Sequence, residues 1–373
     1  MSKAPINVLQ FIVPVGFYGA ERWILALVNN SDYEKVLHDL VVTSESSKQD
    51  LKIIQEYPSG QGKTHVINMS TRIDFSVIAQ LCKIIKERKI DVIHTHGYKS
   101  DILGIIAAKK TGIKCISTPH GFGQPNDFKL KVYIKLGLFF LRFFDRVVPL
   151  SSQLKNESIA YGVPENKITY IQNGVDLTEV KKYRKTKKIK TYGEKKIIGF
   201  IGQMIPRKNI KDLLDIFEAT HRQVPNIELQ ILGDGKSRAE MEIYAKTLSS
   251  FEDIHFLGFR YDRMEYLKQF DIFAMTSKDE GIPRCLMEAM GMELAVAAYD
   301  IPGIDQLITH NETGLLANFG DKETLTKYWI KLLNNDQVSN QLATKSKAFV
   351  DEKFSGQRMA REYTNLFDQL VNQ

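Results

Sequence analysis

Short apolar runs alternate with longer amphipathic segments along the first half of the chain. The runs predict strands at residues 7–13, 37–43, 91–96, 114–120, 146–151 and 168–173. Between several of them lie segments such as 76–89, where apolar positions return at intervals of three and four residues, as in an amphipathic helix. Strands that alternate with helices in this way predict a parallel sheet with helices on both faces.

The same alternation begins again near residue 195. Strand-like runs occur at KIIGFIG, IELQILG, IHFLG, IFAMTS and LAVAAYD, each followed by a helical stretch, and residues 355–373 predict a last amphipathic helix. Residues 181–196 are polar and strongly basic, which indicates a linker or exposed connection whose lysines form a solvated hinge. A chain of 373 residues is too long for one ordinary core. We therefore expect two doubly wound α/β domains, at residues 1–180 and 195–355.

Composition narrows the class of protein. Apolar residues make up 43% of the chain and charged residues 25%, as in a soluble globular protein. The N-terminal apolar run is short and contains Pro14, so it predicts a first strand rather than a signal peptide, and we expect a cytoplasmic protein. The cysteines, Cys82, Cys115 and Cys285, are far apart and form no CxxC pair, which argues against disulfides and a structural zinc site.

Charge is unevenly distributed. Residues 1–190 carry a net charge of +12 and residues 191–373 a net charge of −5. A basic first half suggests an anionic surface or substrate. No helix-turn-helix or RNA-binding signature accompanies these cations, so we do not expect a nucleic acid partner.

Two glycines follow the first predicted strand. In PVGFYGAER, Gly16 and Gly19 precede a helix that we expect to begin near Ala20. Glycines allow close approach of the backbone to a ligand, and a helix N-terminus offers free N–H groups to a phosphate. A plain tight turn explains the same residues equally well. The stretch is not GxGxxG and no ribose-binding acid ends the next strand, so a dehydrogenase is disfavoured.

Histidines cluster after two strands of the first half, in HTHGYKSD and TPHGFG. His94 lies inside a strand and is best explained as a structural core residue, while His96 is open to either explanation. His120 lies beyond its strand, where an imidazole can bond a sugar hydroxyl or a phosphate, and we favour it as functional. No HExxH or CxxC spacing supports a metal site, so none is expected.

The first strand of the second half runs into GQMIPRKN. This places Gly202, Gln203, Arg207 and Lys208 at a strand-to-helix turn. Cations at the N-terminal end of a helix oppose its dipole and so indicate a bound anion such as a diphosphate. An exposed basic turn is the alternative explanation.

Two glutamates frame the turn in SKDEGIPRCLMEAM. Glu280 precedes a helix that Pro283 opens at its first position, and Glu288 follows about two turns into that helix. The two carboxylates are then about 10 Å apart, comparable to the separation of a sugar and a ribose across a diphosphate. We interpret Glu280 as holding the hydroxyls of a sugar or facing its positive charge, and Glu288 as binding the ribose diol. The N–H groups of Gly281 and Ile282 are expected to lie between them.

With these motifs in this order, the chain resembles the family 4 retaining glycosyltransferases of the GT-B fold, which use nucleotide sugars. The resemblance covers nearly the whole chain, from GFYGAER through HTHG, TPHGF, IQNGVD, GQMIPRKN, LGDGKSRAEME and FLGF to DEGIPRCLMEAM and ETGLLA. It implies two Rossmann-like domains facing a cleft, the first binding the acceptor and joined by helix 356–373, the second binding the donor. It also implies the following roles: diphosphate binding by Lys208 and its neighbours, ribose binding by Glu288, sugar binding by Glu280 with the amides of Gly281 and Ile282, lining of the reacting centre by His120, and a border to the base near Arg260.

Two departures from the family pattern stand out. Many relatives have Arg where this chain has Gln203. We therefore expect either that Arg207 supplies the missing charge or that the diphosphate is bound more weakly. The stretch MELAVAAYD lacks the usual Gly-x-Pro before its strand. The resemblance implies no metal and no other cofactor.

The expected reaction is transfer of a hexosyl or N-acetylhexosaminyl group to an acceptor hydroxyl with the anomeric configuration retained. We expect a UDP-sugar donor first and a GDP-sugar next. Residues 127–146 interleave five cations with aromatic and aliphatic residues, which favours a peripheral contact with the inner face of an anionic membrane. A lipid-linked glycan of capsule, exopolysaccharide or O-antigen synthesis is the expected acceptor. The alternatives are a nucleotide-sugar epimerase or phosphorylase of the same fold, and a non-catalytic nucleotide-sugar-binding subunit.

Overall fold

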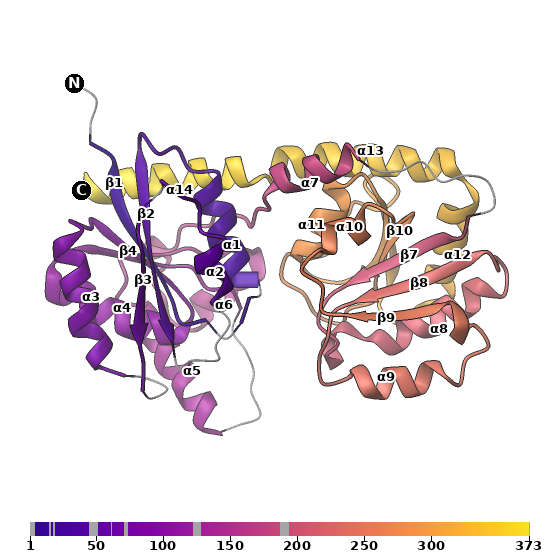
Figure 1. The fold of residues 1–373 in the computed structure, drawn as a ribbon, viewed down its shortest axis with the longest axis horizontal. Helices are drawn as coiled ribbons and strands as arrows, with labels where there is room; N and C mark the ends of the chain where they lie inside the picture. Colours follow the sequence, from indigo (N-terminus) through magenta and orange to yellow (C-terminus); the bar gives the residue numbers. More distant parts are fainter. Residues whose placement is uncertain are drawn as a thin grey trace. The chain divides into compact units, whose positions relative to one another are not determined.

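The computed structural model describes residues 4–14, 16–17, 19–44, 51–60, 62–70, 74–121, 128–186 and 194–372. The chain forms two compact units (Figure 1). The first contains the chain up to Asp176 together with Gly356 onward, and the second contains Leu177–Ser355. The chain thus passes between the units twice.

The first unit is built on one parallel sheet. Among the described residues it has six strands in the order β3-β2-β1-β4-β5-β6. The strands are β1 (Ile6–Ile12), β2 (Val36–Ser44), β3 (Thr64–Asn68), β4 (Val92–His96), β5 (Lys114–Ser117) and β6 (Arg146–Val147). The helices are α1 (Gly19–Asn29), α2 (Lys52–Gln55), α3 (Ser76–Glu87), α4 (Tyr98–Thr111), α5 (Phe128–Leu141), α6 (Ser152–Ala160) and α14 (Gly356–Val371), with a 3₁₀ turn η1 (Glu165–Lys167).

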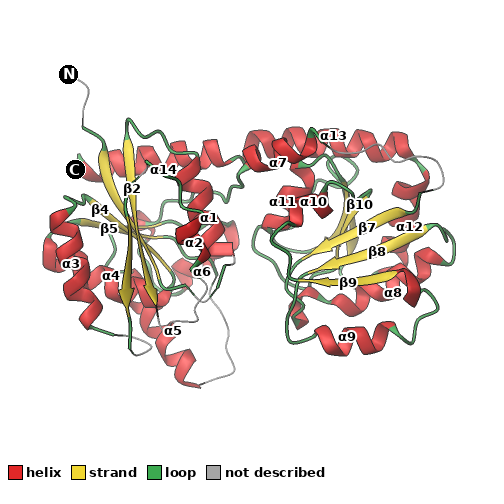
Figure 2. Ribbon diagram, viewed as in Figure 1, coloured by secondary structure: helices red, strands yellow, loops and turns green. Residues whose placement is uncertain are grey.

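Helices cover both faces of this sheet (Figure 2). Along β1, Val8 packs into one apolar cluster with α1 and α14, and Leu9 packs into the opposite cluster with α3 and α4. Successive residues of a strand point to opposite faces, so an unbroken apolar run fills two cores at once.

The C-terminal helix α14 belongs to the first unit. Its buried face repeats at four- and three-residue intervals through Met359, Tyr363, Phe367 and Leu370. This face packs in the same core as α1, beside which α14 runs in Figure 1.

The second unit repeats the architecture. Its described strands form a parallel sheet in the order β12-β11-β10-β7-β8-β9. They are β7 (Lys196–Ile201), β8 (Ile227–Leu232), β9 (Ile254–Gly258), β10 (Ile272–Met275), β11 (Ala295–Asp300) and β12 (Leu315–Asn318). The helices are α7 (Leu177–Arg184), α8 (Ile210–His221), α9 (Arg238–Ala245), α10 (Arg263–Leu267), α11 (Arg284–Gly291), α12 (Lys322–Asn334) and α13 (Asp336–Lys353), with 3₁₀ turns η2 (Pro206–Lys208) and η3 (Phe251–Asp253).

Both sheets have the same strand order once each is numbered from its own first strand. The order reverses direction between β1 and β4 in the first unit and between β7 and β10 in the second. Open α/β sheets bind ligands beyond the carboxyl ends of the strands at such a reversal. The prediction of two doubly wound α/β domains is confirmed.

Several details of the sequence analysis were wrong. Residues 168–173 form no strand: Ile168 makes a single bridge to Val147, and the Arg358 guanidinium binds the carbonyl oxygens of Gln172 and Asn173. Strands β3 and β12 were not predicted. Each lies at the edge of its sheet and is only partly buried, so polar residues interrupt the apolar run: one of five residues is buried in β3 and two of four in β12.

The boundary between the units also differs from the prediction. Residues 177–180 were assigned to the first domain, yet they begin α7, where Leu177 and Val180 pack against Gly291 in the second unit. The basic stretch 181–196 is therefore a connection inside the second unit and not the linker between units. Residues 187–193 of it lie outside the described residues.

Candidate functional site

In the second unit, the loops after the adjacent strands β7 and β10 bring three predicted residues together. Lys208 is buried and its Nζ donates to Oε1 of Glu280, which is also buried. Arg207 donates from one terminal nitrogen to Glu280 Oε2 and to the carbonyl oxygen of Asp279, both at 3.1 Å. The backbone N–H of Lys278 donates to the carbonyl of Arg207 at 2.7 Å, which ties the two loops directly.

Charge on the two cations keeps Glu280 ionised. Burial by itself would raise the pKa of this carboxyl, but the positive charges of Lys208 and Arg207 outweigh burial and hold the pKa below its usual value. Arg207 is 45% exposed whereas Lys208 is 8% exposed, so a ligand from solvent can reach the guanidinium directly. The arrangement is a buried carboxylate beside one buried and one accessible cation.

A glycine that the sequence analysis missed supports the turn at Glu280. Gly303 follows β11 and has φ of 92°, and a Cβ placed there would lie 1.6 Å from the carbonyl oxygen of Gly281. No side chain fits at that distance, so only glycine allows the backbone of residues 301–305 to pack against the turn. The signal in the sequence was the Pro-Gly pair directly after a strand.

Three neighbouring strands also end in closely packed glycines. Gly202 follows β7, Gly233 follows β8 and Gly258 ends β9. The N–H of Gly202 donates to Leu232 O, and the N–H of Gly233 donates to Gly258 O at 2.7 Å. A Cβ on Gly233 would lie 1.8 Å from the Gly202 carbonyl oxygen. These contacts fix the start of the loop that carries Arg207 and Lys208.

Glu288 is buried on α11 and bound by two arginines. Arg263 donates to both of its oxygens, at 2.8 and 3.2 Å, and Arg284 donates to Oε1 at 2.7 Å. Arg263 also reaches Glu179 on α7 at 3.1 Å. The sequence analysis missed both arginines: only the fold brings Arg263 of α10 to Glu288, whereas Arg284 lies four residues before Glu288 on α11, a helical spacing that the sequence did show. Pro283 caps α11 rather than opening it, so Glu288 lies about one turn into the helix and not two.

The other predicted donor-binding residues of the second unit lie around this site. Gln203 is exposed in the loop after β7, Gly281 is exposed beside Glu280, and Ile282 is buried. Arg260 lies beyond β9, where its guanidinium donates to Asp262 through two bonds of 3.0 Å and covers the Tyr266 ring at 4.9 Å. In the described part of the chain, Arg260 makes no hydrogen bond or ion pair with Glu280.

In the first unit, Gly16 lies in the turn from β1 to α1, and Gly19 is the first residue of α1. A Cβ on Gly19 would meet no atom within 4 Å. Packing among the described residues therefore does not require glycine at this position. The roles of Gly16 and Gly19 in phosphate binding stay a prediction.

The predicted histidines come together at the carboxyl ends of β4 and β5. The His120 and His96 rings both pack against Trp23, with centroids 5.2 and 5.4 Å away. Nδ1 of His96 and Nε2 of His120 are 3.2 Å apart. His94 is fully buried and bonds Thr118 Oγ1 through Nε2 at 2.7 Å.

All three histidines are neutral near pH 7. Burial lowers the pKa of His120 to about 3, and burial together with neighbouring histidines lowers the pKa of His94 and His96 well below its usual value. Within the described ranges, no three His, Cys, Asp or Glu side chains are grouped so that they could hold a metal ion.

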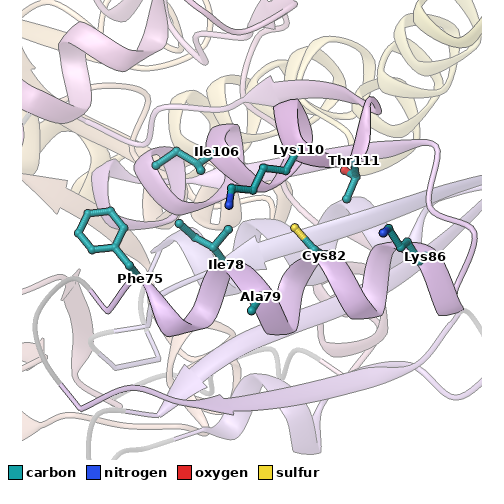
Figure 3. Close-up of a pocket in the computed structure, with 8 residues that line it drawn as sticks. All are labelled: Phe75, Ile78, Ala79, Cys82, Lys86, Ile106, Lys110 and Thr111. Atoms are coloured by element: carbon teal, nitrogen blue, oxygen red, sulfur yellow. The ribbon is translucent and has the colours of Figure 1, made fainter.

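A hollow of about 680 Å³ lies elsewhere on the first unit, between α3 and α4. Side chains of both helices face into it in Figure 3. Its lining residues are Phe75, Ile78, Ala79, Cys82, Lys86, Ile106, Lys110 and Thr111. None of them is a predicted site residue, so this hollow is not the site that the strand ends form.

Two family models match the chain. Residues 18–179 match the model described as Glycosyltransferase Family 4, and residues 181–349 match the model described as Glycosyl transferases group 1. Together they leave out only short segments at the two ends of the chain and residue 180.

Curated relatives and solved structures agree with these matches. The chain is 27% identical over 320 residues to an Escherichia coli UDP-Gal:alpha-D-GlcNAc-diphosphoundecaprenol alpha-1,3-galactosyltransferase, covering 82% of each chain. It is 24% identical to a Bacillus anthracis N-acetyl-alpha-D-glucosaminyl L-malate synthase, over 79% of this chain and 78% of the relative. The crystal structure of Anabaena HepE in complex with UDP-glucose has the same fold, with a TM-score of 0.80 at 18% identity over 98% of this chain and all of that one.

Proposed function

The chain belongs to the family 4 glycosyltransferases of the GT-B fold, and we propose that it moves a sugar from a nucleoside diphosphate donor to an acceptor hydroxyl with retention of the anomeric configuration. The observation that carries this proposal is the ionised, buried Glu280 between Lys208 and Arg207 at the carboxyl ends of β7 and β10. A UDP-sugar is the first expected donor, as in the name of the E. coli relative.

The electrostatics of this site suit a leaving diphosphate. Negative charge grows on the diphosphate as the bond to the sugar breaks, and fixed cations in a poorly solvated site stabilise that charge more than water does. Lys208 is held in place by Glu280, so it needs no rearrangement when the charge develops. Glu280 accepts from the two cations and has further lone pairs with which it can accept from a sugar hydroxyl. The proton of the attacking hydroxyl passes to the departing diphosphate.

The test is a donor screen with UDP-, GDP-, ADP- and TDP-sugars, without metal and with EDTA. We expect one donor class to raise the melting temperature and to release its nucleoside diphosphate slowly, with the same rate in EDTA. NMR of the glycoside product reports its anomeric configuration, which we expect to match that of the donor. An isomerised nucleotide sugar as the product indicates an epimerase instead. No thermal shift with any donor contradicts the proposal.

The acceptor in this proposal is a lipid-linked glycan at an anionic membrane surface, in the synthesis of a bacterial surface polysaccharide. The E. coli relative is named for a diphosphoundecaprenol-linked acceptor. Helix α5 and the turn after it support the same acceptor for this chain, because Leu136 and Phe139 of the helix and Phe143 of the turn are 41 to 47% exposed, while Leu138 and Leu141 are buried in the core. Arg142 covers the Phe139 ring at 4.7 Å, so a cation accompanies the exposed aromatics.

Helix α5 is therefore expected to lie in the headgroup region of the bilayer. Along the described parts of the chain, no helix has the length and apolar character that crossing a bilayer requires. The side chains of residues 127–133, which complete the predicted amphipathic segment, lie outside the described residues.

Liposome flotation tests this contact. We expect the protein to float with vesicles that contain phosphatidylglycerol at low salt and to stay behind with pure phosphatidylcholine. Phe139→Ser with Phe143→Ser should reduce flotation, whereas Phe75→Ser, at an exposed position near α3, should not. Absence of binding to the anionic vesicles at low salt argues against a membrane-bound acceptor.

A further inference from the structure

A chain of hydrogen bonds runs through the interior of the first unit and ends at His120. It starts at the backbone carbonyl of Leu27 in α1, which accepts from Ser31 Oγ at 2.9 Å. Ser31 Oγ is 2.9 Å from Nε2 of His38, and Nδ1 of His38 is 3.0 Å from the amide nitrogen of Gln10. Gln10 and His38 are fully buried on the adjacent strands β1 and β2.

The chain continues across the sheet from β1 to β4. Gln10 Oε1 is 2.8 Å from Nε2 of His96, and Nδ1 of His96 is 3.2 Å from Nε2 of His120. Gln10 lies between two buried histidines and contacts one with each end of its amide.

The carbonyl of Leu27 sets the direction of the first bonds. A carbonyl oxygen can only accept, so Ser31 gives its single hydroxyl proton to Leu27. Ser31 Oγ must then accept from His38, which places the His38 proton on Nε2. Burial lowers the pKa of His38 to about 3, although the neighbouring Asp39 charge opposes this, so the ring is neutral and its Nδ1 can only accept.

The remaining directions follow one from another. An acceptor at His38 Nδ1 requires the NH₂ group of Gln10 to face it, which turns the amide oxygen toward His96. That oxygen accepts, so the proton of the neutral His96 is on Nε2 and its Nδ1 accepts from His120. His120 must therefore donate from Nε2. Since His120 is also neutral, its Nδ1 carries no proton.

Ring packing keeps the imidazoles from turning over and exchanging these nitrogens. Trp23 meets the His120 ring edge to face and lies tilted against His96, and the His96 and His120 centroids are 5.4 Å apart. His38 is packed against the Phe367 ring of α14 with centroids 6.1 Å apart. A flipped ring would lose its bond in the chain and leave a buried donor or acceptor unpaired.

We propose that Gln10 and His38 are positioning residues for His120: they fix its proton on Nε2 and leave Nδ1 as an acceptor that selects a sugar hydroxyl over a phosphate oxygen. A hydroxyl can donate to Nδ1, whereas a phosphate oxygen carries no proton to give near neutral pH. The selection for a hydroxyl rests on the proposed glycosyl transfer, but the position of the proton does not. His120 then holds or orients a sugar, and the diphosphate is left to the cations of the second unit.

The proton position can be measured directly on the full chain with ¹⁵N-labelled histidine. Long-range ¹H–¹⁵N correlation spectra distinguish a protonated ring nitrogen from an unprotonated one, and a His120→Gln variant identifies the His120 signals among the eight histidines. We expect Nε2–H for His38, His96 and His120 at pH 7.5. A proton on Nδ1 of His120 overturns the inference, whatever the donor screen shows.

Two variants break the chain at different points. Gln10→Met keeps the side-chain length and removes both of its bonds, so His96 and His120 should become mixtures of tautomers. Ser31→Ala removes the anchor near the surface and should have a smaller effect in the same direction, and Ser31→Thr should restore the wild-type spectrum. Unchanged His120 signals in folded Gln10→Met, or in folded Ser31→Ala if Gln10→Met does not fold, contradict the proposal.

Activity provides a second readout, with the donor that the screen identifies. The kcat/KM of Gln10→Met should fall a few-fold, in proportion to the fraction of His120 that no longer carries its proton on Nε2, and Ser31→Thr should recover most of the activity lost in Ser31→Ala. A general packing defect would lower the activity of both Ser31 variants without moving the His120 proton. If the donor screen fails, the spectra still test the position of the His120 proton. The proposed glycosyl transfer and the proposed proton position can therefore be refuted independently.

Discussion

The two units have the same strand order, but the polar side chains buried in them are of different kinds. In the first unit, neutral side chains such as Gln10, His38 and His96 are joined in one line of hydrogen bonds. In the second, Glu280 and Glu288 are each held by two cations. One backbone architecture therefore supports two solutions to burying polar groups.

The difference is consistent with the ligand proposed for each site. A buried charge is stable only when it is paired, and fixed cations suit the charge of a diphosphate. A buried neutral group needs only a hydrogen-bond partner, and a neutral line of fixed direction suits an uncharged sugar hydroxyl. The comparison predicts that the units respond differently to pH, to loss of charge and to changes of backbone.

Acidification should give the largest difference between the units. A histidine held neutral in the fold but free to charge when unfolded contributes stability above pH 6.5 that is lost as pH falls toward its lowered pKa. Burial lowers the pKa of His38 to about 3, so this residue should reduce the free energy of unfolding by about 2 kcal/mol between pH 7 and pH 5. His94, His96 and His120 act in the same direction, because their pKa values are also lowered.

Asp101 opposes this trend. Burial raises its pKa to about 7, so the fold gains stability from its protonation as pH falls through 7, by about 2 kcal/mol at pH 5. Hydrogen exchange corrected for the intrinsic effect of pH should show loss of protection in β1 and β4 but not in β7 and β10. Asp101→Asn should make the loss in the first unit steeper. Equal loss of protection in both units would refute the contrast.

Removal of one charge should be the next largest effect. Lys208→Ala leaves Glu280 buried with one accessible cation and should lower turnover at least about a hundredfold, or about 2.7 kcal/mol in the barrier. Glu280→Ala should lower turnover at least about tenfold. Lys327→Ala removes a lysine that is 68% exposed and paired with Glu323, and serves as the control. Turnover near that of wild type in folded Lys208→Ala would show that this cation has no part in the reaction.

Backbone strain distinguishes a supporting glycine from an ordinary one. Gly303→Ala should destabilise the protein by at least about 2 kcal/mol, because φ is positive and the new Cβ collides with the Gly281 carbonyl. Gly320 has φ of 85° with nothing within 4 Å, so Gly320→Ala should cost only about 1 kcal/mol of conformational strain. Urea unfolding measures both. Equal losses would mean that the contact at Gly281 does not support the turn.

Arg260 should give the smallest effect. Its charge pairs with Asp262 at the surface, where ion pairs contribute little to stability. Arg260→Ala should leave the melting temperature unchanged and alter turnover only a few-fold, with any change confined to discrimination between UDP- and GDP-sugars. A large drop in turnover with every donor would place Arg260 in the reacting centre instead.

The sequence by itself determined the architecture and indicated where the candidate site lies. Alternating apolar runs and amphipathic helices fixed two parallel sheets, since a strand buried on both faces needs apolar residues throughout. Turn residues after strands then marked Lys208 and Glu280, because parallel strands carry ligand sites at their carboxyl ends. The edge strand β3 was not predicted, because it is mostly exposed and its sequence THVIN is not a continuous apolar run.

Only the tertiary structure decided which side chains are partners. Arg263 pairs with Glu288 from 25 positions away, Gly303 supports a turn 22 positions before it, and Gln10 lies 86 positions from His96. The direction of the hydrogen bonds that reach His120 depends on the backbone carbonyl of Leu27 in α1, and no local sequence pattern predicts this contact. Strand order sets these distances, and burial then makes each polar group depend on whichever partner the fold has placed within reach.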